Sequence, residues 1–254
     1  MDKNILYLTF HGHTRDLVRL PLQEGMAHYP LGRRAAIKDI IEATGVPHTE
    51  VGSIVCAAQE LTFHFIPEGR EQIDVYPFTK AIPVTRATVL RPEPFPGPRF
   101  LVDINVAKLA RNLRMAGIDA ASVPDAGIVE TACLANSEKR IVLTRNRELL
   151  KVRTIAFGQL LRSENPLQQL AEVVQRYGLR GSIQPFTRCL QCNTVLKPVA
   201  KEQVIDLLEP LTKKYYDDFK QCASCTRIYW RGSHHQRMAV MISAATTLSD
   251  SGIL

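Results

Sequence analysis

Apolar positions alternate with polar ones in several short segments of the first ninety residues. This alternation predicts strands at residues 5–10, 17–20, 53–58, 61–65 and 72–78. Between the second and third of these segments, Ala36, Ile37, Ile40 and Ile41 follow helical spacing, and Gly45 ends the helix. Two strands, a helix and further strands indicate a small α+β domain of the β-grasp type.

From Phe100 onward the pattern changes to strands and helices in alternation. Short apolar runs predict strands at residues 100–102, 140–144 and 154–157. Helical spacing predicts a helix from about 106 to a stop at Gly117, then helices at 127–137 and from 147, and a last one from Asn165-Pro166 to Gly178. This order is typical of an α/β domain with a mainly parallel sheet.

The proline-rich residues 92–98 separate the two patterns, because this composition holds neither a helix nor a central strand. We therefore expect a domain at 1–91, a stiff linker at 92–98 and an α/β domain at 99–185. A small cysteine-containing module at 186–240 and a tail at 241–254 follow.

Composition favours a soluble protein of several domains over a secreted or membrane-spanning one. The chain has 254 residues and ordinary apolar and charged fractions, so we expect more than one soluble domain. Its start lacks the features of a secretion signal, and no apolar run approaches the roughly 18 residues that a membrane span requires. We therefore expect the cytoplasm and no membrane partner.

Positive charge is concentrated after residue 98. Residues 1–98 carry 10 basic and 11 acidic side chains, residues 99–185 carry 13 and 8, and residues 186–254 carry 9 and 6. This distribution favours a polyanionic partner, above all nucleic acid.

Two Cys-x-x-Cys pairs, Cys189 with Cys192 and Cys222 with Cys225, predict a structural Zn²⁺ site. The pairs are 29 residues apart, and four thiolates at this spacing can form a tetrahedral shell around one ion. Buried or disulfide-bonded cysteines and a redox-active pair are the alternatives. The redox role is disfavoured because neither pair opens a helix after a clear strand.

Polar residues follow two strands of the expected parallel sheet. Asp103 comes directly after the first strand and Asn146 just after the second, while Asp125 and Glu130 flank the start of the helix between them. Ligands bind at such strand ends, and converging carboxylates could hold Mg²⁺ or Mn²⁺ for nuclease chemistry. The alternative is that Asp103 and Asp125 only cap helices and that Glu130 is a solvated surface residue.

Basic and aromatic side chains form two candidate RNA-binding groups. Lys108, Arg111 and Arg114 lie off the apolar face of the first α/β helix, which makes its outer side basic. In the cysteine module the candidates are Lys213, Lys214, Arg227, Trp230 and Arg231. Stacking on Trp230 together with phosphate contacts would suit RNA, whereas packing of the module against the α/β domain is an equal alternative for the aromatic residues.

The second half of the chain resembles a known ribonuclease family. The resemblance rests on these segments: Phe100-Leu101-Val102-Asp103 with Leu109 to Arg114, Gly117-Ile118-Asp119, the run from Arg140 to Leu150, Thr187 to Asn193, and Cys225 with Arg227 to His234. It covers about residues 99–240. The family is the Mut-C family, a PIN-like ribonuclease domain with a fused zinc ribbon, named for the C-terminal part of the mut-seven exonuclease.

This resemblance implies metal-dependent RNA cleavage by an acidic cluster in which Asp103 matches the first carboxylate. In the nuclease hypothesis that follows, Arg145 or Arg147 would steer phosphate. Where the family pattern has an aspartate after Thr-Arg, this chain has Asn146, which lacks the negative charge that attracts Mg²⁺. The departure keeps a second hypothesis open: a catalytically impaired RNA-binding or ribonucleoprotein-binding adaptor.

The first half resembles ubiquitin-like β-grasp domains related to the sulfur carriers of thiamine and molybdopterin synthesis. The shared segments are Ile37 to Glu42, Gly45 to Gly52 and Asp74 to Pro77. Sulfur carriers act through a free C-terminal Gly-Gly, whereas this chain continues into the proline-rich segment and ends Ser-Gly-Ile-Leu. We therefore expect a docking or structural module that recruits a protein partner.

Overall fold

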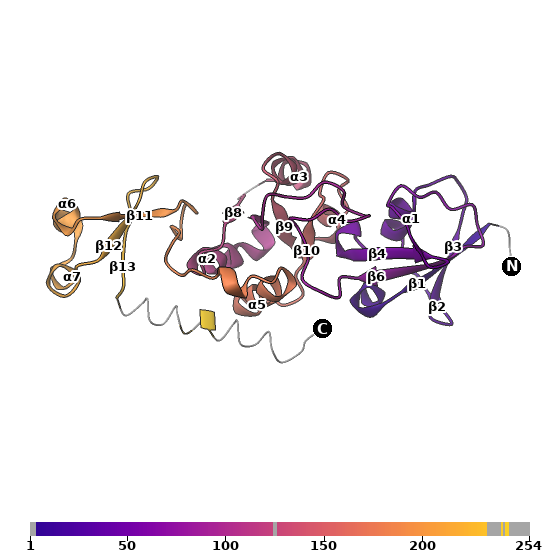
Figure 1. Ribbon diagram of the computed structural model, residues 1–254, viewed down its shortest axis with the longest axis horizontal. Helices are drawn as coiled ribbons and strands as arrows, with labels where there is room; N and C mark the ends of the chain where they lie inside the picture. Colours follow the sequence, from indigo (N-terminus) through magenta and orange to yellow (C-terminus); the bar gives the residue numbers. More distant parts are fainter. Residues whose placement is uncertain (1–3, 124–125, 233–239, 241, 244–254) are drawn as a thin grey trace. The chain divides into compact units, whose positions relative to one another are not determined.

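The computed structural model describes residues 4–123, 126–232, 240, 242 and 243 (Figure 1). Contacts within the chain divide these residues into two compact units. One unit contains the described residues of 1–98 and 126–160, and the other contains those of 99–125 and 161–253. The segment boundaries expected from composition remain predictions. Asp125 and nearly all of the expected tail lie outside the described residues.

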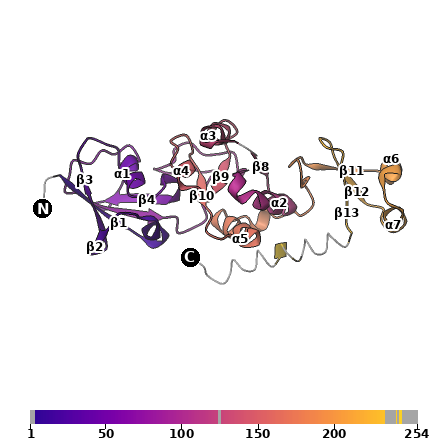
Figure 2. The same cartoon turned by 180° about the vertical axis from the view of Figure 1, so that it is seen from behind.

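A six-stranded sheet in the order β2-β3-β1-β6-β4-β5 forms the start of the first unit. Its strands are β1 (Ile5–Phe10), β2 (Leu22–Gln23), β3 (Met26–Pro30), β4 (Val51–Cys56), β5 (Gln59–Glu60) and β6 (Gln72–Pro77). Strand β1 pairs in parallel with β6 and antiparallel with β3. Helix α1 (Ile37–Ala43) buries Ile37, Ile40 and Ile41 against the sheet (Figure 2). The predicted ubiquitin-like β-grasp arrangement is confirmed.

Two of the expected β-grasp strands are wrong, because local hydrogen bonds give their residues other roles. Leu17 ends a 3-10 helix (Gly12–Leu17), and residues 18–20 follow it without forming a strand. The Thr14 hydroxyl stabilises this helix by donating to the His11 carbonyl at 2.7 Å. Residues 61–65 form a loop whose carbonyl groups accept from the first amides of α1, including Ile37 N to Phe65 O at 2.7 Å. These amides have no partner within their own helix.

The first unit also contains α3 (Ile128–Ser137), β9 (Ile141–Thr144), α4 (Arg147–Leu150) and β10 (Gly158–Leu160). Strands β9 and β10 pair in parallel, with Val142 opposite Gly158. The third α/β strand was expected at 154–157 and lies later, because Ile155 and Phe157 fill the core from a loop. A Cβ atom at Gly158 would lie 2.5 Å from a methyl group of the buried Leu150, so a side chain here would force Leu150 to move.

The residues before and within the proline-rich segment pack onto the first unit. Leu90, Arg91 and Phe95 are buried, and the Phe95 ring lies 4.8 Å from that of Phe157. The Arg91 guanidinium donates to the carbonyl groups of Ala156, Val51 and His48 at 3.0 to 3.1 Å. The side chains of Arg91 and Phe95 therefore anchor this segment to the first unit.

The second unit begins with a parallel pair, β7 (Phe100–Val102) and β8 (Ala120–Ser122). Helices α2 (Ala107–Met115) and α5 (Pro166–Arg176) accompany it, and the Asn112 side chain of α2 donates to the Pro166 carbonyl at 3.1 Å. Strand β8 was not expected, because Ala120, Ala121 and Ser122 are small residues of weak strand propensity. Each unit thus contains a parallel strand pair, β9 with β10 in the first and β7 with β8 in the second, and the predicted α/β class is confirmed.

The cysteine module belongs to the second unit and forms a three-stranded antiparallel sheet in the order β11-β12-β13. Its strands are β11 (Leu196–Val199), β12 (Phe219–Cys222) and β13 (Ile228–Trp230), with α6 (Lys201–Val204) and α7 (Pro210–Tyr215) between the first two. This is the architecture of a zinc ribbon. Within the described part of the chain, no helix has the length and apolar character needed to cross a bilayer.

Candidate zinc centre and acidic site

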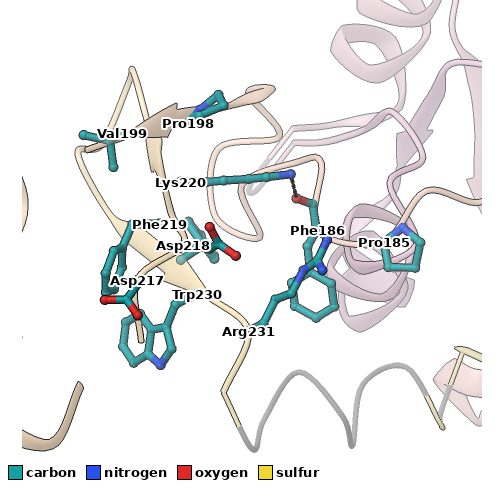
Figure 3. Close-up of a pocket in the computed structure, with 11 residues that line it drawn as sticks. Pro185, Phe186, Pro198, Val199, Asp217, Asp218, Phe219, Lys220, Trp230 and Arg231 are labelled. Carbon is teal, nitrogen blue, oxygen red and sulfur yellow. Dashed lines mark hydrogen bonds between the residues drawn. The ribbon is translucent and has the colours of Figure 1, made fainter. Parts of the chain in front are cut away.

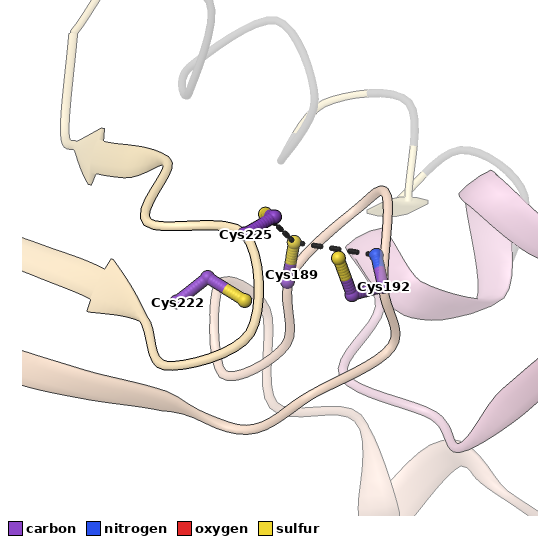
Figure 4. A group of neighbouring side chains, drawn as sticks. All are labelled: Cys189, Cys192, Cys222 and Cys225. Carbon is purple, nitrogen blue, oxygen red and sulfur yellow. Dashed lines mark hydrogen bonds between the residues drawn. The ribbon is translucent and has the colours of Figure 1, made fainter.

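The four predicted cysteine ligands converge at one point of the ribbon. The sulfur atoms of Cys189, Cys192, Cys222 and Cys225 all lie within 4.8 Å of one another, and those of Cys189 and Cys225 are 3.6 Å apart (Figure 4). A tetrahedral Zn²⁺ with bonds of about 2.3 Å requires sulfur separations of about 3.8 Å. The donor set and its spacing therefore fit one zinc ion.

Each cysteine pair lies on a tight turn of the same kind. In the first turn the Asn193 amide donates to the Cys189 carbonyl at 3.0 Å, and in the second the Thr226 amide donates to the Cys222 carbonyl at 3.0 Å. Asn193 and Thr226, each four residues after the first cysteine of its pair, have positive φ angles of 66° and 58°. The two turns thus present their sulfur atoms in equivalent ways.

Hydrogen bonds prepare the Cys189 sulfur to act as a thiolate. Burial raises the pKa of this thiol, but donation from the Tyr229 hydroxyl and from backbone amides outweighs burial and lowers the pKa to about 6. The Tyr229 oxygen lies 3.1 Å from the sulfur and also accepts from the Leu190 amide. Since zinc binds the thiolate form, these bonds prepare Cys189 as a ligand, whereas hydrogen bonding with Cys225 raises the pKa of Cys192 to about 12.

Arg114 has a different role from the one expected. The sequence places it on an exposed basic face of α2, and this prediction is wrong, because the residue is only 6% exposed. Its guanidinium donates to the carbonyl groups of Leu190 and Gln191 in the first cysteine turn and to that of Ala120 in β8. Arg114 therefore joins α2 to the zinc ribbon and is no candidate for RNA binding.

A second group of side chains makes the same connection. The Asn193 side chain donates to the Asp119 carboxylate at 2.8 Å and accepts from the Ala120 amide at 3.1 Å. Arg188 donates to the Asn193 carbonyl at 2.9 Å and lies 3.4 Å from the Asp119 carboxylate. Sequence patterns alone point to no role for these residues, although all three lie in the motifs that carry the family resemblance: Asp119, Arg188 and Asn193.

Asp103 lies where the sequence places it, directly after β7. The residue is 8% exposed and caps a 3-10 helix, its carboxylate accepting from the Ile104 amide at 2.7 Å and from the Asn105 side chain at 2.8 Å. The carboxylate is thus held in a fixed orientation at the carboxyl end of a parallel strand.

Asn146 caps α4 in the same manner. Its side-chain oxygen accepts from the Glu148 amide at 3.0 Å, and its own amide donates to the Thr144 hydroxyl at 2.9 Å. Asparagine and aspartate cap a helix N-terminus about equally well. The capping role therefore accounts for an asparagine at position 146, and an aspartate there would cap the helix as well.

Glu130 is exposed and lies in the first turn of α3. Its carboxylate occupies the space beside Gly127, where a Cβ atom would approach the Glu130 Oε2 to 2.6 Å. Glu130 and Asn146 belong to the first unit and Asp103 to the second. Their convergence with Asp125 into one acidic site remains a prediction.

The predicted RNA-contacting residues, Arg114 excepted, retain surface exposure. The half-buried ones are Arg147 and Lys213. The exposed ones are Lys108, Arg111, Arg145, Lys214, Arg227, Trp230 and Arg231. Arg147 donates to the Leu17 carbonyl at 3.0 Å, so part of its guanidinium is engaged within the first unit. Trp230 is 37% exposed, and its ring lies 6.4 Å from that of the buried Phe219.

Comparisons with known proteins identify two family models along the chain. A model described as the Mut7-C RNAse domain matches residues 98–242, and one described as Mut7-C ubiquitin matches residues 3–83. Among curated proteins and solved structures, none matches the chain. The two models occur in the order that the sequence resemblance indicates.

Proposed function

This chain belongs to the Mut7-C RNAse domain family, and from this membership we propose that it is a metal-dependent endoribonuclease. The match over residues 98–242 is the observation that carries the proposal, since it covers both the α/β elements and the ribbon. The reducing cytoplasm is the proposed location, because it suits zinc thiolates.

The proposed catalytic residues are Asp103, Asp125, Glu130 and Asn146. Asp103 is the principal metal ligand, because its carboxylate is already oriented by the Ile104 amide and by Asn105. Asp125 and Glu130 add negative charge, and Asn146 contributes an amide oxygen. Carboxylate and amide oxygens are the ligands that Mg²⁺ and Mn²⁺ prefer, and such an ion would activate water and offset charge on the scissile phosphate.

RNA binding is assigned to basic side chains of the α/β elements and of the ribbon. Lys108 and Arg111 lie exposed on α2, and Arg145 and Arg147 flank Asn146 in the chain. On the ribbon, the proposed RNA-binding residues are Lys213, Lys214, Arg227, Trp230 and Arg231. Phosphate neutralisation by such residues makes RNA affinity fall as salt concentration rises.

The proposal is tested with circular RNA, which has no ends and is cut only by an endonuclease. Zinc-loaded protein with added Mn²⁺ should linearise the circle, and Asp103→Asn should abolish the cutting. The asparagine side chain of this variant would retain the cap at Ile104 but lose the charge that attracts the metal. Cutting by the wild type and the variant at the same rate would exclude Asp103 as a ligand.

A second function, an RNA-binding or ribonucleoprotein-binding adaptor with an impaired nuclease site, is favoured by Asn146. Its amide lacks charge, and its oxygen already accepts from the Glu148 amide. In this function the β-grasp domain, which matches the Mut7-C ubiquitin model, recruits a protein partner. RNA binding that persists without any metal-dependent cutting would support the adaptor.

A further inference from the structure

A short 3-10 turn, His48–Glu50, joins the β-grasp sheet to strand β10 within the first unit. All three of its residues are buried. The His48 ring donates from Nε2 to the Ile155 carbonyl in the loop before β10 at 2.7 Å. The Glu50 carboxylate accepts from the amide of Leu160, the last residue of β10, at 2.7 Å. The turn therefore holds the α/β part of this unit on both sides of the strand.

Glu50 is the unusual member of this turn, because it is an acidic residue that is only 3% exposed. Burial of a carboxylate is unfavourable unless hydrogen bonds compensate it. One oxygen accepts from the Leu160 amide, and the other lies 3.1 Å from the His13 Nε2. The Leu160 side chain also packs against the β-grasp core. Glu50 thus ties the carboxyl end of β10 to the β-grasp domain.

The contact of Glu50 continues along the sheet toward Asn146. Leu160 lies opposite Thr144, the last residue of the parallel strand β9. The Thr144 hydroxyl in turn accepts from the Asn146 amide at 2.9 Å. Two residues, Leu160 and Thr144, therefore connect the buried carboxylate with a proposed metal ligand.

A second contact with the β-grasp domain lies on the other side of Asn146. Arg147, the next residue, donates to the Leu17 carbonyl at 3.0 Å. Leu17 is a buried member of the β-grasp core. Asn146 is therefore held between two contacts that the β-grasp domain supplies.

We propose that Glu50 is a positioning residue of the nuclease site, through which the β-grasp domain holds Asn146 in place for the metal. Mg²⁺ demands near-ideal geometry from its ligands, so freedom at the end of β9 would weaken its binding. The inference rests on the proposed nuclease, in which Asn146 supplies a ligand oxygen. The dependence of the Asn146 segment on Glu50 is measured without cleavage, so the two can fail separately.

Amide hydrogen exchange of the full-length, zinc-loaded protein, followed by NMR without RNA, tests this dependence. Glu50→Ala removes the acceptor of the Leu160 amide. We expect the amides of Leu160 and of Glu148, which donates to the Asn146 side chain, to exchange about tenfold faster. Glu50→Gln keeps an oxygen that accepts from Leu160, so it should restore most of the protection.

Two controls separate positioning from general destabilisation. Ile73→Val removes a buried methyl group opposite Cys56, at the end of β4 that lies away from the turn, and should not produce the local increase at Glu148. Trp230, the only tryptophan, stands next to Phe219 in the ribbon (Figure 3). Its fluorescence should be the same in all variants, and a changed emission in Glu50→Ala would contradict a local effect.

Cutting of circular RNA gives the second readout. Glu50→Ala should raise the Mn²⁺ concentration needed for half-maximal cutting several-fold, whereas Glu50→Gln and Ile73→Val should leave it close to that of the wild type. An unchanged Mn²⁺ requirement in Glu50→Ala would overturn the link to the metal. Absence of cutting by the wild type would contradict the nuclease, and exchange would still decide the positioning. Unchanged exchange at Glu148 in Glu50→Ala, or an equal increase in Ile73→Val, would overturn the inference.

Discussion

The guanidinium of Arg114 donates a hydrogen bond to the carbonyl oxygen of Gln191 at 2.9 Å, inside the first cysteine turn. Its second bond in that turn goes to Leu190 at 3.1 Å, and its remaining donors reach Ala120 and Ser122. One buried side chain thus connects α2, β8 and the zinc ribbon. The position of the first cysteine pair therefore depends on the α/β elements of the same unit.

Replacing Arg114 with lysine should destabilise this connection. A single ammonium group cannot serve four acceptors in a fixed fork, so buried carbonyl groups lose their partners. We expect Arg114→Lys to lower the free energy of unfolding by about 2 kcal/mol, measured by guanidinium denaturation. Arg111→Lys, on the exposed side of the same helix, is the control and should change little. Equal stability of both variants would show that the bonds to the ribbon contribute nothing.

Removing one zinc ligand should empty the metal site. Cys222 is buried, and a serine there cannot supply the fourth thiolate. We expect one zinc per wild-type chain and close to none in Cys222→Ser, determined by elemental analysis of the purified proteins. Cys133→Ser, which changes an exposed cysteine outside the ribbon, should retain the metal. Full zinc content in Cys222→Ser would contradict the four-cysteine site.

Gly117 should tolerate no side chain. Its φ angle is +82°, and a Cβ atom would collide with the Gln184 carbonyl. Gly117→Ala is expected to lower the free energy of unfolding by about 2 kcal/mol or more, as seen in denaturant titrations. At Gly181 a Cβ atom meets nothing within 4 Å, so Gly181→Ala should be close to neutral. The strain argument fails if the two variants are equally stable.

Arg91 should be as important to the first unit as Arg114 is to the second. Its guanidinium donates to four carbonyl groups and lies 4.9 Å from the Phe78 ring centre and 5.4 Å from that of Phe157. Lysine cannot reproduce the planar contacts. Arg91→Lys should lower the melting temperature by several degrees, whereas Arg86→Lys, at an exposed arginine nearby, should not. An unchanged melting temperature for Arg91→Lys would show that these contacts are dispensable.

The zinc site could be predicted from sequence because each Cys-x-x-Cys turn is local and the ligand chemistry is specific. Asp103 and α2 were also predictable, since a short apolar run and helical spacing place them. Arg114 could not be assigned in this way: its carbonyl partners in the ribbon lie 76 and 77 residues away, and helical spacing alone leaves it off the apolar face. Strand β8 was missed because its small residues give no apolar signal.

We propose that the nuclease site of this chain is attenuated by Asn146. The most direct measurement compares Mn²⁺-dependent cutting of circular RNA by the wild type and by Asn146→Asp. The variant leaves the cap of α4 intact, because aspartate accepts from the Glu148 amide as asparagine does, and it restores a charge that attracts the metal. We expect Asn146→Asp to cut faster than the wild type, and we expect this cutting to be lost when Asp103→Asn is added. If the double and single variants cut alike, or if Asn146→Asp cuts no faster than the wild type, the claim is wrong.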